Sequence, residues 1–256
     1  MRMVAAFAVA AGLSIPAFFG APADAAEIKM MISNALKSSM EELTPQYEKA
    51  SGDKLVITFG AANELKASIE KGEAVDLAIL TTATADDLVK AGKLNPAGRT
   101  DIARAGAGIA ARKGAPKPDI STTEGFKRAM LDAKSIAYVE AGATAPYFKG
   151  LLDRLGIADQ VKPKLKPQPT SNPAAKAVAN GEAELGITQI SEILPYAGAE
   201  LVGPMPPEIQ LYTVYPAALA ADTKQAEGAK AVIKFLTGPA AITVFKAKGL
   251  SPGAGV

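Results

Sequence analysis

Small, hydroxyl and amide residues follow the ends of three predicted strands, and they are well placed to bind a ligand. They are Ser33 and Asn34, then Ala62 and Asn63, then Thr81 and Thr82. In each case a strand passes into a helix, so backbone N–H groups gather at a helix start. Helix starts carry partial positive charge and bind anions. The repetition predicts a site for a small anion, although ordinary helix capping would explain each turn alone.

The chemistry that the residue types exclude is equally informative. The chain contains no His, no Cys and no Trp. The commonest base at neutral pH, the thiol nucleophile and the preferred soft metal ligands are therefore missing. This favours a binding protein over an enzyme, and it predicts no metal site and no cofactor. The alternative is an exported enzyme that uses Ser, Lys or Asp chemistry.

The first 25 residues have the pattern of a cleavable secretory signal. Arg2 gives the positive start, an apolar run covers residues 4–19, and Ala23-Asp24-Ala25 ends it with small residues. The run is too short for a convincing membrane span. Export without Cys is typical of the bacterial periplasm, and no Cys is present to carry a lipid anchor. We expect a periplasmic, freely soluble protein.

The length, hydrophobic content and net charge of the chain limit the architectures and the partners to be expected. The chain has 256 residues, 48% of them hydrophobic, and 28 basic against 26 acidic residues give a net charge of +2. This length can bury a large core and is compatible with two lobes. No run of like charge suggests nucleic-acid binding. We expect a monomer without a nucleic-acid partner.

The elements that position the candidate residues alternate along the chain. Strands are predicted over residues 28–32, 54–59, 75–80, 106–112, 135–140, 164–168, 184–188 and 212–219. Helices are predicted over residues 33–51, 64–71, 85–91, 122–132, 147–155, 173–180, 224–237 and 240–248. Repeated strand–turn–helix units indicate an α/β fold with mostly parallel sheets. Tyr147 and Gln189 stand at such junctions, and Tyr147 is equally explained as a half-buried helix residue. The Pro- and Gly-rich residues 202–207 predict an exposed loop.

Several stretches resemble a known family. They are residues 43–52 (LTPQYEKASG), 59–60 (FG), 71–79 (KGEAVDLAI), 112–122 (RKGAPKPDIST) and 180–186 (NGEAELG). On these residues nearly all of the chain after the signal resembles the periplasmic molybdate-binding components of ABC importers. The resemblance implies the type II periplasmic binding protein fold, in which two helix-flanked lobes are joined by crossing strands.

The resemblance also implies where ligand contacts should fall. Two family serines that bind oxyanion oxygens match Ala35 and Ala62, where Ser33, Asn34 and Asn63 are the neighbours that could replace them. The remaining family contacts fall on Thr81 or Thr82, on the turn around Thr144, near Ser171, and on Gln189 in place of a Tyr. The missing hydroxyl donors point to a different small anion, such as an organic carboxylate.

Together these observations predict a periplasmic solute-binding protein of an ABC importer. It would capture a molybdate-like oxyanion or a small organic carboxylate and deliver it to a permease in the inner membrane. Lobe one would comprise residues 26–105 and 217–256, and lobe two residues 106–216, with crossing strands near residues 105–111 and 212–216. The lobes would close over the ligand. A ligand-binding module that feeds a sensor is a further alternative.

Overall fold

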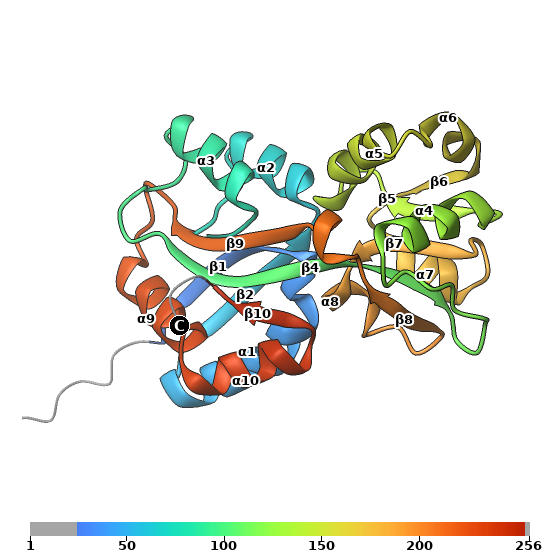
Figure 1. The fold of residues 1–256 in the computed structure, drawn as a ribbon. Helices are drawn as coiled ribbons and strands as arrows, with labels where there is room; N and C mark the ends of the chain where they lie inside the picture. Colours follow the sequence, from blue (N-terminus) through green and yellow to red (C-terminus); the bar gives the residue numbers. More distant parts are fainter. Residues whose placement is uncertain (1–24, 254–256) are drawn as a thin grey trace, which may run out of the picture.

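The computed structural model describes residues 25–253. The signal peptide predicted over residues 1–25 lies outside the described residues, apart from Ala25. The described chain alternates short strands with helices, and the predicted α/β class is confirmed (Figure 1).

Eight of the ten strands in the described residues occupy positions that the apolar runs predict, with shifts at their ends. The strands are β1 (Glu27–Ser33), β2 (Lys54–Gly60), β3 (Leu77–Ile79), β4 (Thr100–Arg112), β5 (Ile136–Val139), β6 (Leu165–Gln168), β7 (Leu185–Gln189), β8 (Ala199–Pro204), β9 (Tyr212–Leu219) and β10 (Leu250–Pro252). Of these, β8 and β10 were not predicted.

The helices fill the connections between these strands. They are η1 (Asn34–Leu36), α1 (Lys37–Ser51), α2 (Ala62–Glu70), α3 (Thr82–Lys90), α4 (Thr123–Asp132), α5 (Thr144–Arg154), α6 (Ala158–Val161), η2 (Lys162–Lys164), α7 (Ala174–Ala179), α8 (Ile190–Ile193), η3 (Pro207–Ile209), α9 (Ala226–Leu236) and α10 (Pro239–Ala247). As predicted, α1 ends before Gly52, whose φ of 83° suits glycine. Pro239 opens α10, where its missing N–H costs nothing.

The strands run in the order β2-β1-β3-β9-β4-β7-β5-β6, with β8 and β10 paired to β4. β1 pairs in parallel with β2 and β3, and β5 pairs in parallel with β6 and β7. The long strand β4 joins these two groups. Its residues 100–106 pair with β9, and its residues 107–112 pair with β7 and β8. We call the part around β1, β2, β3 and β9 the first half, and the part around β5–β8 the second half.

Each face of the first half has its own apolar core. Alternate residues of one strand point to opposite faces, so Ile32 packs with α1, α9 and α10 whereas Met31 packs with α2 and α3. Leu77 and Ala78 of β3 divide in the same way. Figure 1 shows α2 and α3 over one face of this sheet and α1, α9 and α10 over the other.

The second half repeats this three-layer plan. Ile136 and Tyr138 of β5 pack with α4, α5 and α6, while the intervening Ala137 packs with α7. Helices therefore cover two faces of the sheet in each half. The lobe boundaries at residues 105/106 and 216/217 remain a proposal. In the structure, residues 212–216 of β9 pair with the first half's portion of β4.

Some details of the prediction are wrong. Residues 202–204 form the end of β8 and pair with β4 across a register shift, although the Pro- and Gly-rich composition predicted a loop throughout 202–207. Pro204 fits because it is the last residue of that strand. β4 begins at Thr100 rather than at residue 106, and α2, α3 and α5 start two or three residues earlier than predicted. Sequence patterns also missed the short elements α6, α8 and β10.

Over residues 25–253 no single helix has the length and hydrophobicity of a membrane span. The consecutive helices α9 and α10 meet those criteria only as a pair, with a bend of 62° between them.

Candidate functional site

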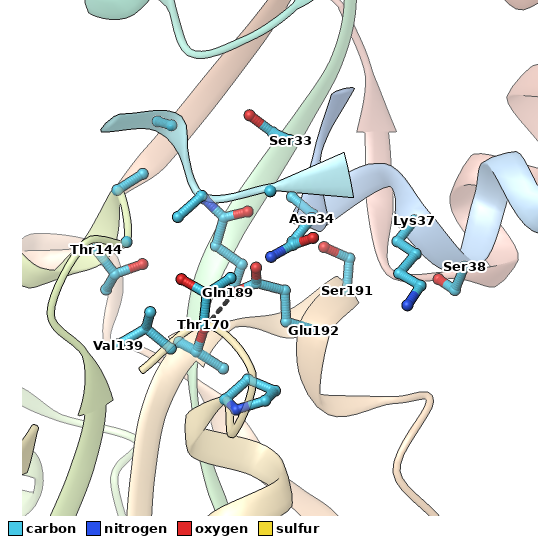
Figure 2. Close-up of a pocket in the computed structure, with 18 of the residues that line it drawn as sticks. Ser33, Asn34, Lys37, Ser38, Val139, Thr144, Thr170, Gln189, Ser191 and Glu192 are labelled. Atoms are coloured by element: carbon cyan, nitrogen blue, oxygen red, sulfur yellow. Dashed lines mark hydrogen bonds between the residues drawn. The ribbon is translucent and has the colours of Figure 1, made fainter. Parts of the chain in front are cut away.

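A cavity of about 280 Å³ lies where the carboxyl ends of the strands from both halves converge (Figure 2). In parallel α/β sheets this edge is the usual place for a ligand, because loops and helix starts gather there. The first half contributes Ser33, Asn34, Ala35, Lys37, Ser38, Glu41, Gly60, Ala61, Ala62, Thr81 and Tyr215. The second half contributes Val139, Gly142, Ala143, Thr144, Thr170, Pro173, Thr188, Gln189, Ser191, Glu192, Pro195 and Tyr196.

Most of the residues singled out from the sequence come together in this lining. Those that line the cavity are Ser33, Asn34, Ala62, Thr81, Thr144 and Gln189. They come from five strand-to-helix junctions, because Ser33 and Asn34 share the junction between β1 and η1. Whether each contacts a ligand remains a prediction.

The other four predicted residues lie outside the lining. They are Asn63, Thr82, Tyr147 and Ser171. The Thr82 hydroxyl donates to the Val214 carbonyl at 3.4 Å, and the Tyr147 hydroxyl donates to the Ile209 carbonyl at 2.8 Å. Each of these hydroxyls therefore already has a backbone partner. Asn63 is exposed on the first turn of α2.

The starts of α2 and α3 are capped by protein groups. The Thr81 hydroxyl accepts from the Thr84 N–H at 3.3 Å and donates to the Thr84 hydroxyl at 2.9 Å. At α2 the Glu64 carboxylate accepts from the Ala61 N–H at 3.2 Å. The side chain of Thr81 thus fixes the helix start, and the N–H groups left at these starts are the donors that an anion could use.

A hydrogen bond links the two sides of the cavity at its rim. The Thr170 hydroxyl, ahead of α7, donates to the Glu64 carboxylate of α2 at 2.7 Å. Glu64 therefore joins the start of α2 to the second half. The contact is solvent-exposed, so its net contribution to the free energy is modest.

The back of the cavity contains a buried pair. The Tyr215 hydroxyl of β9 donates to the Gln189 side-chain oxygen at 2.6 Å, and both residues are only 2% exposed. Burial raises the pKa of Tyr215, and the nearby Glu192 carboxylate adds to that rise. Tyr215 is therefore neutral at physiological pH, and the Gln189 oxygen is occupied. The amide N–H groups of Gln189 are left as its donors.

Glu192 of α8 is the one acidic group that the lining holds away from solvent. Burial raises the pKa of its carboxyl above the ordinary range, although hydrogen bonds from the Thr188 hydroxyl and the Gln189 backbone act in the opposite direction. The other charged residues of the lining are Lys37 and Glu41. Their side chains are 54% and 60% exposed, and their charged atoms lie 3.9 Å apart.

Three buried hydroxyls in the lining, those of Ser33, Ser38 and Ser191, have no protein partner among the described residues. Ser33 is 4% exposed and Ser191 is 2% exposed, and neither Oγ forms a hydrogen bond with any described residue. Buried polar groups are nearly always paired, so these hydroxyls are candidates for ligand contacts. Over residues 25–253 no group of three or more His, Cys, Asp or Glu residues is arranged for a metal ion.

Comparison with known proteins gives the family. Residues 28–251 match the family described as bacterial extracellular solute-binding protein. The chain belongs to this family of solute-binding proteins.

Two relatives of this solute-binding protein carry different names. An aconitate isomerase from Pseudomonas sp. is 29% identical over 230 residues, covering 88% of this chain and 87% of that protein. The molybdate-binding protein ModA from Escherichia coli K12 is 28% identical over 251 residues, which cover 94% of this chain and 95% of that protein. The periplasmic molybdate-binding protein of Azotobacter vinelandii has the same fold, with a TM-score of 0.74 at 20% identity over 87% of this chain and 98% of that one.

The resemblance to periplasmic molybdate-binding proteins is thus confirmed, together with the type II fold that it implied. The expectation that the solute-binding protein is not an enzyme stays a prediction, because one relative is named as an isomerase.

Sequence reasoning missed Glu192, Ser191 and Tyr215 as cavity residues. Only part of a signal for the first two was available: Glu192 stands three residues after Gln189, where a capping box places its acidic residue, but Gln189 is not the Ser or Thr with which such a box begins. Tyr215 had no local signal, since it lies within a strand far along the chain from the residues that it meets.

Proposed function

We propose that this solute-binding protein captures a small organic carboxylate and delivers it to an ABC importer. The observation that carries the proposal is the cavity at the meeting strand ends, which is lined by neutral hydrogen-bond donors and by the half-buried carboxyl of Glu192. The other charged residues of the lining, Lys37 and Glu41, have exposed side chains. Neutral donors suit an anion that must be released again, because they bind it without a buried counter-charge.

The lining favours a carboxylate over a metal oxyanion. Ala35 and Ala62 line the cavity at the positions where the molybdate-binding family is expected to hold serines. A hydrogen bond to a charged acceptor contributes about 1.5–3 kcal/mol, so two missing hydroxyls would weaken oxyanion binding by orders of magnitude. The volume of about 280 Å³ is also close to the range of pockets that hold small organic ligands.

A thermal-shift panel tests the ligand class. The purified protein is heated with succinate, citrate, tricarballylate, molybdate, tungstate, sulfate and phosphate. A ligand present at 100 times its Kd stabilises the native state by about 2.7 kcal/mol, which is an easily measured shift. A shift with carboxylates supports the proposal, and a shift with molybdate and tungstate alone contradicts it.

A second candidate function is an isomerase of an unsaturated tricarboxylate. It is favoured by the relative named aconitate isomerase and by Glu192, a cavity carboxyl whose raised pKa suits proton transfer. Moving a double bond requires a base that takes a proton from one carbon and an acid that returns it to another. Incubation with cis- or trans-aconitate in D₂O, followed by NMR, tests this function. Formation of the other isomer by the wild type and its loss in Glu192→Gln would support it.

The proposed route of the ligand is through a periplasmic monomer and an inner-membrane permease. Closure of the two halves around the ligand would present the closed form to the permease. If the neighbouring genes encode an ABC permease and its ATPase, ligand-dependent stimulation of ATPase activity in vesicles reconstituted with them tests this step. Stimulation of a sensor protein instead would favour the signalling alternative.

A further inference from the structure

Each half brings to the cavity a buried hydroxyl that forms no hydrogen bond within the described part of the protein. Ser33 ends β1 in the first half, whereas Ser191 lies in α8 of the second half. α8 packs against η1, the element that directly follows Ser33. Both line the cavity, both are more than nine-tenths buried, and neither hydroxyl has a partner among the described residues. Their burial within a ligand cavity indicates that a ligand group completes their hydrogen bonding.

Glu192 lies on the same side of the cavity as Ser191, one residue after it in α8. In Figure 2 its side chain lies beside those of Ser191 and Asn34. The Thr188 hydroxyl donates to one of its carboxyl oxygens and so fixes the side chain. The glutamate therefore presents a fixed carboxyl group to whatever fills this part of the cavity.

The charges around Glu192 decide whether its carboxyl group is ionised or protonated when an anion binds beside it. The titratable groups that face it are Tyr215 from β9, Tyr196 beyond α8, and Lys37 with Glu41 from α1. Both tyrosine pKa values are raised, and Lys37 is an exposed residue beside Glu41. No charged side chain in the described part of the protein offsets the Glu192 charge, and burial raises the pKa of Glu192. An ionised Glu192 would repel a carboxylate strongly in this environment.

We propose that Ser33, Ser191 and Glu192 form a subsite for one carboxylate group of an organic di- or tricarboxylate, and that Glu192 occupies it in the protonated form. The protonated carboxyl donates a hydrogen bond to a ligand oxygen, and the two serine hydroxyls donate to the same carboxylate. A second carboxylate of the ligand is then free to reach the helix starts at Ala62 and Thr144. Where Glu192 is ionised in the free protein, binding takes up one proton from solvent. This inference rests on the proposed carboxylate-binding function.

Infrared difference spectroscopy tests the protonation state directly. Succinate and tricarballylate are fully ionised at pH 8, so a protonated-carboxyl C=O band in the complex must come from the protein. We expect this band in the wild-type complex, its loss in Glu192→Gln, and its retention in Glu227→Gln, which changes an exposed glutamate of α9. A complex without a band that depends on Glu192 overturns the subsite and leaves the carboxylate-binding function standing.

Titration calorimetry tests the two serines. Ser33→Ala and Ser191→Ala should each weaken succinate or tricarballylate binding about tenfold, because each removes a hydrogen bond to a charged acceptor. Thermal unfolding of the free variants shows whether they remain folded. Unchanged affinity in both folded variants overturns the inference. Absence of binding by every carboxylate overturns the proposed function as well.

Discussion

The hydroxyl of Tyr215 donates a hydrogen bond to the side-chain oxygen of Gln189 at 2.6 Å, deep in the cavity. In the molybdate-binding family a tyrosine is expected at position 189 itself. Here the Tyr215 hydroxyl, which comes from another strand, contacts the Gln189 side chain that stands at this position. The pair joins β9, in the first half, to the end of β7, in the second half. It therefore links the ligand cavity to the strands that connect the halves.

Removal of the Tyr215 hydroxyl should destabilise the protein. In Tyr215→Phe the Gln189 oxygen loses its donor while remaining buried, which costs about 1–3 kcal/mol in the free energy of unfolding. Urea denaturation measures this change. Tyr212→Phe is the matched control, because Tyr212 is 57% exposed at the start of the same strand. Equal stability of the two variants would contradict the assigned role of the pair.

The raised pKa of Glu192 predicts how stability depends on pH. The unfolded glutamate titrates near pH 4.3, so above this pH the native state holds more protons than the unfolded state. The wild type should lose stability relative to Glu192→Gln as the pH rises from about 4.3 to the folded pKa. Each unit of pKa rise corresponds to about 1.4 kcal/mol.

Urea titrations between pH 4 and pH 8 measure this difference in the absence of ligand. Gln keeps the side-chain length and a hydrogen-bonding end, so the comparison isolates the charge. Glu227→Gln, at a side chain that is 88% exposed, should follow the wild type at every pH. A constant difference between the wild type and Glu192→Gln across the range would show that the pKa is not raised.

The hydrogen bond between Thr170 and Glu64 predicts an effect on affinity. Thr170→Val removes the 2.7 Å contact between α2 and the second half but leaves the Glu64 cap of Ala61 in place. We expect the Kd of the carboxylate found in the panel to rise about fivefold, because a net hydrogen bond contributes about 1 kcal/mol. Thr170→Ser retains a hydroxyl and should bind like the wild type. If the Thr170→Val and Thr170→Ser variants bind the carboxylate with equal affinity, the contact does not stabilise the bound form.

Restoring the expected serines should change the ligand preference. Ala35→Ser combined with Ala62→Ser adds two hydroxyl donors to the cavity lining. Calorimetry with molybdate should show an affinity gain of at least tenfold, because each hydrogen bond to a charged acceptor contributes about 1.5–3 kcal/mol. Ala240→Ser, at an exposed position in α10, is the control. A double variant without any gain would mean that these two positions do not decide oxyanion binding.

The sequence by itself determined the α/β class, the parallel strands at the centre of each half and the ends of most elements. The antiparallel pairings of β4 and β9 were not part of the prediction. The predicted features depend on local periodicity and on residues such as Gly52 and Pro239, which act within one turn of the chain. The same local reasoning found Ser33, Thr81 and Gln189, because a strand that passes into a helix marks the ligand edge of a parallel sheet.

Only the tertiary structure decided which polar groups share the cavity. Tyr215 reaches Gln189 because β4 pairs with β9 over one part of its length and with β7 over the other, and no local pattern reports such pairings. Tyr147 and Gln189 stood at similar junctions in the sequence, but packing directed the Tyr147 hydroxyl to the Ile209 carbonyl, outside the cavity lining. The burial that raises the pKa of Glu192 also arises from packing between elements. Residue type and local spacing therefore predict the edge of the sheet where a ligand binds, whereas long-range strand pairing sets the chemistry of the cavity.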